Sequence, residues 1–153
     1  MRRRSSAMRT ILCLLAIVGP SVGTTSLAWA GVADKPLPVK TWRKTANDIC
    51  RQAKQLRSEI ASEVFADLAQ DEQPSAALLT AYVGQIEPVV QQQIDSIGAL
   101  EEPTSLEKKV AKLLKTARKE LDALVADPAN FTEANPFSAT ELAAKKLKLK
   151  KCA

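Results

Sequence analysis

Residues 49–68 read ICRQAKQLRSEIASEVFADL and decide the fold. Their apolar side chains recur at spacings of four and three residues, which places them on one face of an α-helix. This apolar stripe consists of Ile49, Ala53, Leu56, Ile60, Val64 and Leu68. The charged residues between them are expected to face solvent, namely Arg51, Lys54, Arg57, Glu59, Glu63 and Asp67. The pattern predicts an amphipathic helix from Thr41 to about Ala69.

The same periodicity appears in three further segments, at residues 79–100, 104–125 and 136–147. The third segment opens with Thr104-Ser105-Leu106-Glu107, which has the form of a helix-capping box. Inside the second segment, Pro88 lacks an amide proton and crowds the carbonyl of Gly84, so we expect a kink or a break there. Together the segments predict an all-α domain over residues 41–153, folded as an antiparallel up-down four-helix bundle.

Residues 1–30 have the parts of a secretory signal peptide. Met1–Thr10 carries four arginines and no acidic residue, Ile11–Val18 is apolar, and Ala28-Trp29-Ala30 supplies the small residues for cleavage after Ala30. A transmembrane anchor is the alternative, but this apolar run falls far short of the roughly 20 residues needed to span a bilayer. We therefore expect a secreted or extracytoplasmic chain, in the periplasm or cell envelope, with no transmembrane segment. Residues 31–40 contain two prolines and no periodicity, and are expected to form a flexible leader.

The composition excludes several classes of function. The absence of histidine excludes His-based triads, His general bases, His zinc ligands and His-ligated haem. Four of the 22 basic residues and none of the 17 acidic ones lie in residues 1–30, which leaves a net charge of +1 on the rest. Such a balance does not suit nucleic-acid binding, which is typical of strongly basic domains. Both methionines also lie in residues 1–30, so the rest of the chain has neither His nor Met, the usual axial ligands of haem iron. We therefore expect no haem, and we expect no metal or other cofactor either.

Cys50 and Cys152 are the two cysteines that follow the signal peptide. In an oxidising compartment such a pair is typical of a disulfide. A metal site or a redox pair is the competing interpretation, although the two cysteines form no CxxC motif and have no histidine beside them. A disulfide here would close a loop of about 100 residues and stabilise the fold by about 4 to 5 kcal/mol.

The lengths of the segments agree with this pairing. In an up-down bundle the first and fourth helices are antiparallel neighbours. The helix from Cys50 to Gln70 measures about 30 Å. The fourth segment, as about twelve helical residues followed by about five extended ones, covers about 34 Å. We therefore expect the chain after the last helix to continue in the same direction until it reaches Cys50.

Three short stretches carry a resemblance, namely Ala46–Arg51, the L-x-x-P sequence Leu100–Pro103, and Leu147–Ala153. In these the chain resembles a group of small exported helical proteins, largely uncharacterised, that are common in actinobacteria. The resemblance implies an exported helical fold and no particular reaction, ligand or catalytic residue. Members of that group often have glycine where this chain has Lys148, so the usual glycine stop of the last helix is missing here.

Binding is the expected function, because the sequence contains no recognisable nucleophile-base pair and no glycine-rich phosphate loop. The first hypothesis is a noncatalytic, monomeric binding or interaction module whose partner is a protein, a lipid or the cell wall. An unrecognised hydrolase, for example with a Ser-Lys pair, is the enzymatic alternative.

Two more specific hypotheses name residues. In the first, the chain carries an apolar ligand such as a lipid between its helices, with an opening at Tyr82, Gly84 and Pro88. Alternatively, its C-terminal segment binds an anionic membrane or cell-wall polymer. That segment interleaves Leu147 and Leu149 with five lysines, Lys145, Lys146, Lys148, Lys150 and Lys151.

Overall fold

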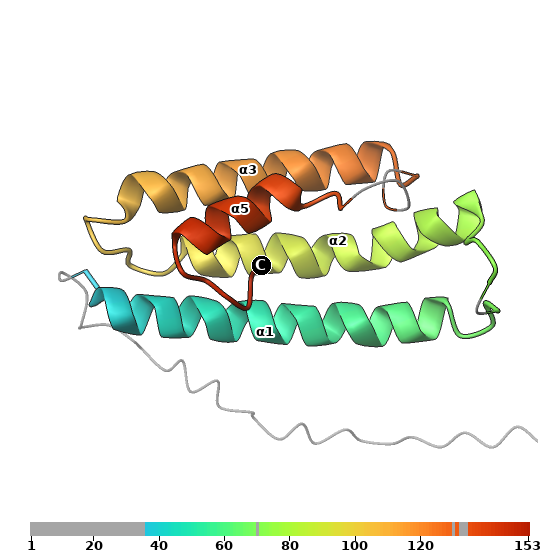
Figure 1. The fold of residues 1–153 in the computed structure, drawn as a ribbon, viewed down its shortest axis with the longest axis horizontal. Helices are drawn as coiled ribbons and strands as arrows, with labels where there is room; N and C mark the ends of the chain where they lie inside the picture. The colour runs from blue at the N-terminus through green and yellow to red at the C-terminus, as the bar shows by residue number, and fades with distance from the viewer. Residues whose placement is uncertain (1–35, 70, 130, 132–134) are drawn as a thin grey trace, which may run out of the picture. The chain divides into compact units, whose positions relative to one another are not determined.

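The structure, a computed structural model, describes residues 36–69, 71–129, 131 and 135–153. The predicted signal peptide lies outside these residues. The described residues form helices α1 (Val39–Val64), α2 (Ala76–Gly98), α3 (Glu107–Ala126) and α5 (Ser138–Lys146), and no strand. Successive helices run in opposite directions, with α2 between α1 and α3 and the short α5 packed on α3 (Figure 1). The domain is therefore the all-α up-down four-helix bundle that the sequence predicted.

The first helix begins at Val39, two residues before the predicted start. Pro38 precedes it, and the Pro38 carbonyl accepts the first helical hydrogen bond from the Trp42 amide at 2.9 Å. Leu37 packs against the core and donates its amide to the Glu101 carbonyl at 3.3 Å. Leu37 and Val39 both pack against the buried apolar residues of the core. The end of the predicted flexible leader therefore belongs to the packed domain.

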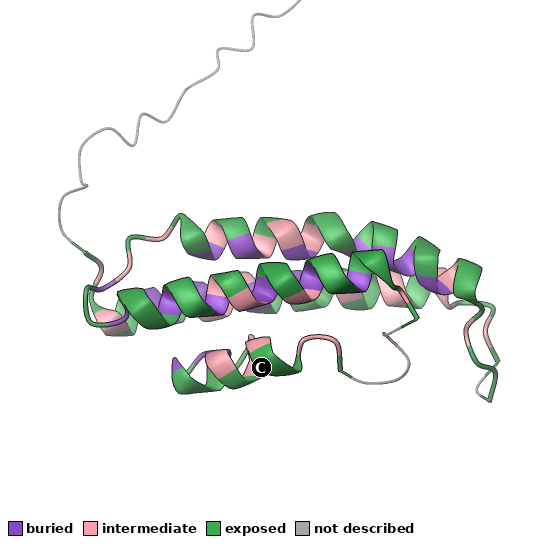
Figure 2. Ribbon diagram, turned by 90° about the horizontal axis from the view of Figure 1, so that it is seen from above, coloured by how far each residue is buried: buried purple, intermediate pink, exposed green. Residues whose placement is uncertain are grey.

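The buried residues of the long helices face one another along the length of the bundle (Figure 2). At one end Trp42, Cys50 and Val110 are fully covered, together with Leu147 and Leu149 from the C-terminal segment. At the other end Tyr82, Val83, Ile86 and Leu124 form a second cluster. The apolar stripes predicted from the periodicity therefore form the core, as the hydrophobic effect requires.

Pro88 lies inside α2, which continues through it from Ala76 to Gly98. The first turns of α2 are inclined to the remainder (Figure 1). A bend within one helix, rather than two separate helices, therefore accommodates the missing amide of Pro88. Gly84 is exposed, and a Cβ atom built on it would meet nothing within 4 Å, so no close packing requires glycine there.

Two helix starts differ from their predicted form. The Thr104 capping box does not form: α3 begins at Glu107 after a turn, and Leu106 occupies the N-cap without a side-chain hydrogen bond. At the start of α5, the Glu120 carboxylate of α3 accepts the amides of Ala139 and Thr140, each at 2.9 Å. Capping of α5 therefore comes from a neighbouring helix, and it fixes the helix start against α3.

The chain reverses direction after α5, which contradicts the predicted straight course to Cys50. Lys148 has a φ of 60°, and the amide of Leu149 donates to the Ala144 carbonyl at 2.9 Å. The Lys148 amide donates to the Lys145 carbonyl at 3.0 Å, which completes a Schellman motif. The prediction failed because this turn usually contains glycine, and the lysine gave no sign of a left-handed residue.

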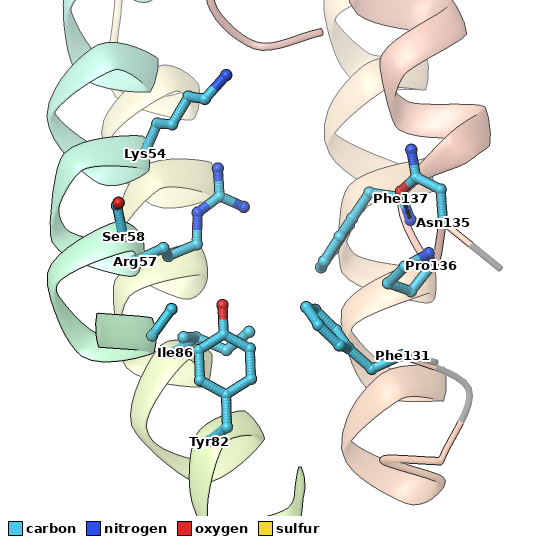
Figure 3. A pocket seen from close by; sticks show the side chains of 10 residues that line it. Lys54, Arg57, Ser58, Tyr82, Ile86, Phe131, Asn135, Pro136 and Phe137 are labelled. Atoms are coloured by element: carbon cyan, nitrogen blue, oxygen red, sulfur yellow. Dashed lines mark hydrogen bonds between the residues drawn. The ribbon is translucent and has the colours of Figure 1, made fainter. Parts of the chain in front are cut away.

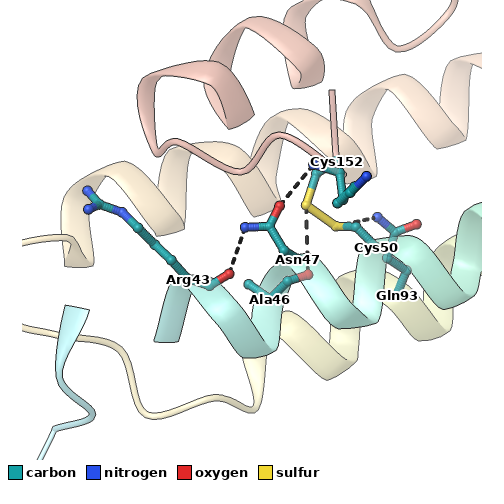
Figure 4. The surroundings of a disulfide bond; sticks show 7 residues. Arg43, Ala46, Asn47, Cys50, Gln93 and Cys152 are labelled. Atoms are coloured by element: carbon teal, nitrogen blue, oxygen red, sulfur yellow. Dashed lines mark hydrogen bonds between the residues drawn. A yellow bond between two sulfur atoms is a disulfide. The ribbon is translucent and has the colours of Figure 1, made fainter. Parts of the chain in front are cut away.

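After the turn, the C-terminal segment follows one face of α1 toward Cys50 (Figure 4). Arg43 donates from Nε to the Leu147 carbonyl at 2.9 Å, and the Lys151 amide donates to Asn47 Oδ1 at 2.9 Å. Cys152 then forms a disulfide with Cys50, with a Cα–Cα distance of 5.1 Å. Contacts at positions 43, 47 and 50 lie one helical turn apart, so the tail follows the axis of α1.

Replacing Lys148 by glycine should stabilise the protein. The substitution removes the steric cost of a left-handed lysine and adds backbone entropy to the unfolded chain, so we expect a net gain of about 0.5 to 1 kcal/mol. Urea unfolding of the oxidised protein measures this gain. Lys150→Gly is the matched control at an exposed position without positive φ, and it should destabilise. Equal effects of the two substitutions would contradict this account of the turn.

Removing the disulfide should lower the free energy of unfolding by about 4 to 5 kcal/mol, because the cystine closes a long loop in the unfolded chain. The bridged residues are separated by 102 positions. Urea unfolding of the oxidised protein and of the double variant Cys50→Ala/Cys152→Ala measures the difference. The single variant Cys152→Ala should match the double variant, and a loss below about 1 kcal/mol would show that the loop is already restrained when unfolded.

Candidate functional site

The phenylalanine and tyrosine side chains gather at one end of the bundle. The chain has three phenylalanines and a single tyrosine. The Tyr82 ring lies 5.0 Å from the Phe65 ring and 5.1 Å from the Phe131 ring, between centroids. Phe137 packs against the same cluster from the segment that leads into α5. These rings come from α1's C-cap, α2 and the α3–α5 connection, so the fold brings together residues that are distant in the sequence.

A groove with a volume of about 520 Å³ opens beside these rings. We call it the aromatic groove. Tyr82 and Ile86 of α2 form its floor, and α1 forms one wall (Figure 3). Phe131 and Phe137 face α1 from the opposite side (Figure 3). The described residues that line it are Lys54, Arg57, Ser58, Ala61, Tyr82, Ile86, Phe131, Asn135, Pro136 and Phe137.

Two cations of α1 reach into the aromatic groove. Lys54 and Arg57 are one helical turn apart, and both side chains extend into the space that faces Phe131 and Phe137 (Figure 3). The Arg57 guanidinium is partly buried, and this desolvation lowers its pKa. Burial also raises the pKa of the Tyr82 phenol, against the opposing effect of the Arg57 charge. The groove is thus apolar on the side of Phe131 and Phe137 and positively charged on the side of α1.

A second cavity of about 210 Å³ continues from the groove toward the disulfide. It shares Lys54, Arg57 and Phe137 with the aromatic groove. Gln93 Oε1 and Thr140 Oγ1, which belong to residues lining this cavity, are buried and have no hydrogen-bond partner in the described parts of the chain. The polar character of the site therefore increases in the direction of Cys152.

The structure places the residues of the predicted ligand opening on different sides of α2. Tyr82 lines the aromatic groove. Gly84 and Pro88 are exposed and are not among the described residues that line it. Six residues of helix separate Tyr82 from Pro88, which turns Pro88 away from Tyr82. Any ligand opening at Tyr82 thus lies between α1 and the α3–α5 connection and does not involve the bend at Pro88.

All five lysines of the C-terminal segment are exposed. Leu147 and Leu149, which the anionic-surface hypothesis paired with them, are fully buried. Lys146 instead lines a surface depression of about 270 Å³ between α3 and α5, together with Lys109, Lys112 and the exposed Leu142. Contact with a membrane or cell-wall polymer through this segment remains a prediction, and it loses the apolar component that the sequence offered.

Sequence reasoning missed most of the aromatic groove. Lys54 and Arg57 flank the apolar stripe of α1, and residues at such positions usually face solvent. Phe131 lies in the connection between α3 and α5, where no periodicity indicates burial. The one available signal was the placement of all three phenylalanines near predicted helix ends.

Comparison of the chain with known protein families, curated proteins and solved structures finds no match. The resemblance to exported actinobacterial proteins therefore stays a prediction. Among the helices that the structure describes, none is long and apolar enough to cross a membrane. Over the same residues, no three side chains of the types that bind metals gather in one place. The functional argument therefore rests on the geometry of the groove.

Tyr82 should report the charge of Arg57 during an alkaline titration. It is the only tyrosine, so the absorbance change of ionisation belongs to it alone. Its pKa is raised by burial, so the wild-type midpoint should lie above the ordinary value of about 10. Arg57→Gln removes a charge that lowers this pKa, and the midpoint should therefore rise further.

Arg51→Gln is the matched control, because Arg51 is exposed and is not among the residues lining the groove. A lower midpoint in Arg57→Gln than in the wild type would contradict the placement of the guanidinium beside the phenol. The raised pKa also means that stability is retained below about pH 10 and declines as the pH rises toward the folded-state pKa.

Proposed function

We propose that the chain is an exported, noncatalytic binding module that holds an apolar ligand in the aromatic groove. The observation that carries the proposal is the convergence of Tyr82, Phe131 and Phe137 on a groove of about 520 Å³. Ligand sites for small molecules have volumes of this order and are lined mainly by apolar and aromatic side chains. The depressions between α3 and α5 have no aromatic lining and expose lysines, so they suit an apolar ligand less well.

Export and binding support each other in this proposal. Residues 1–30 have the composition of a signal peptide, and the Cys50–Cys152 disulfide suits an oxidising, extracytoplasmic compartment. The cargo or partner is then a molecule met outside the cytoplasm, such as a lipid.

The noncatalytic part of the proposal is supported by the arrangement of the groove's hydroxyl groups. Ser58 and Lys54 lie one helical turn apart and are the pair that a Ser-Lys enzyme would need. The Lys54 ammonium points away from Ser58, and no hydrogen bond connects the two side chains (Figure 3). A nucleophile requires a base within hydrogen-bond reach, which this pair does not offer.

Filling the aromatic groove should abolish ligand binding. The probe is N-phenylnaphthylamine, an uncharged apolar dye that becomes fluorescent when it is buried, titrated into oxidised protein that starts at Gly31. Ser58→Trp places a large ring in the groove without removing a core contact, because Ser58 is exposed. We expect saturable binding to the wild type and at least about tenfold weaker binding to this variant.

Ser62→Trp is the matched control, since Ser62 is exposed one turn further along α1 and does not line the groove. Its affinity for the dye should equal that of the wild type. The absence of saturable binding to the wild type, or equal loss in both variants, would refute a ligand site in the aromatic groove.

A further inference from the structure

We infer that the ligand of the aromatic groove is an anionic amphiphile, a single apolar chain with an acidic head group held by Arg57 and Lys54. The inference rests on the proposed function and names the class of ligand for the same site. Three features support it, namely the unpaired arginine, the separation of charge from rings across the groove, and the free phenol of Tyr82.

The first feature is the contrast between Arg57 and the other arginines. The described residues include four arginines. Arg51 pairs with Asp48 at 2.8 Å, Arg118 pairs with Asp95 at 3.3 Å, and Arg43 donates to the Leu147 carbonyl at 2.9 Å. Arg57 is partly buried, and this desolvation lowers its pKa, yet it has no ion pair or hydrogen bond to any residue that the structure describes.

A partly buried cation without a partner is costly, because it loses water without gaining a compensating charge. The guanidinium presents several N–H donors in a flat fork that matches the two oxygens of a carboxylate or the oxygens of a phosphate. An acid bound beside Arg57 would supply the missing partner. The site is therefore more suited to an anionic ligand than to a neutral or cationic one.

The second feature is the division of the groove into a charged and an apolar side. Lys54 and Arg57 both extend from α1, whereas Phe131 and Phe137 lie opposite (Figure 3). A ligand that satisfies both sides must have an apolar portion and an acid in the same molecule. A fully polar anion would leave the rings uncovered, and a neutral hydrocarbon would bury the guanidinium further without pairing it.

The third feature is the Tyr82 hydroxyl, which points into the groove (Figure 3). It has no hydrogen-bond partner in the described parts of the chain, so it can donate to an acid oxygen bound beside Arg57. Glu141, an acidic residue that lines the adjoining cavity, already accepts a hydrogen bond from Asn135 Nδ2 at 2.8 Å. The Tyr82 hydroxyl and the Arg57 guanidinium are therefore available to a ligand, whereas the Asn135 amide is engaged.

The test compares molecules with one chain and different head groups. Dodecanoate, dodecyl phosphate and dodecanol are each used, below their aggregation limits, to displace N-phenylnaphthylamine at neutral pH. We expect at least one of the two acids to bind at least about tenfold more tightly than dodecanol. Arg57→Gln should reduce acid binding to the level of dodecanol, and dodecanol should still displace the dye from this variant.

Two further variants separate charge from folding. Arg57→Lys keeps the charge but loses the fork, so its affinity for the acids should lie between those of the wild type and Arg57→Gln. Arg51→Gln, which changes an exposed arginine on the same helix, should bind like the wild type. The dodecanol affinity of each variant shows whether its groove is still folded.

The outcomes distinguish this inference from the proposed function. Equal affinity of the three molecules for the wild type would overturn the acidic head group and leave the apolar site intact. Failure of all three to displace the dye would refute the proposed site itself. Tighter binding by either acid that persists in Arg57→Gln would also overturn the inference, because the selectivity would then come from another residue.

Discussion

The bond between Cys50 and Cys152 is the constraint on which the rest of the structure depends. The helix α5 has only nine residues and contributes Ala144 as its one buried residue, too little apolar surface to hold a helix in place by itself. The covalent link fixes the tail on α1, and Leu147 and Leu149 are then covered by the core. Because the Glu120 carboxylate holds the start of α5 on α3, the segment at 135–137 is restrained where it joins α5, and it lines the side of the groove opposite α1.

The sequence predicted the helices well because burial of an apolar stripe has a period that can be counted. The helix predicted from Thr41 to about Ala69 appears as α1 (Val39–Val64), and the periodic segment at 79–100 appears as α2 (Ala76–Gly98), with shifts of two to five residues at their ends. The bounds of α5 lie within two residues of the predicted segment at 136–147. The reversal after α5 escaped prediction because it depends on a left-handed lysine, and the cap of its start because Glu120 supplies it from another helix. Such features arise from tertiary contacts and leave no local pattern.

The aromatic groove was only partly predictable for a similar reason. Tyr82 belongs to the periodic stripe of α2 and was identified as a candidate ligand contact. Arg57 occupies a flank of α1, and whether such a position faces water or a groove depends on what packs beside it. Here the neighbours are Phe131 and the segment at 135–137, which show no helical period in the sequence, so their place opposite α1 could not be predicted from spacing.

Ligand binding should stabilise the fold, because the cation and the aromatic rings of the groove belong to different parts of the chain. Arg57 belongs to α1, and Phe137 precedes α5, so a ligand that touches both favours the arrangement that the disulfide also enforces. A molecule that binds only the folded state stabilises it in proportion to its affinity and concentration. The Arg57 guanidinium is desolvated and has no ionic partner among the described residues, which opposes folding, and the disulfide offsets that cost. The disulfide thus allows the bundle to keep the Arg57 cation in an apolar groove. The same unpaired cation that lowers the stability of the ligand-free protein makes the groove selective for an acid.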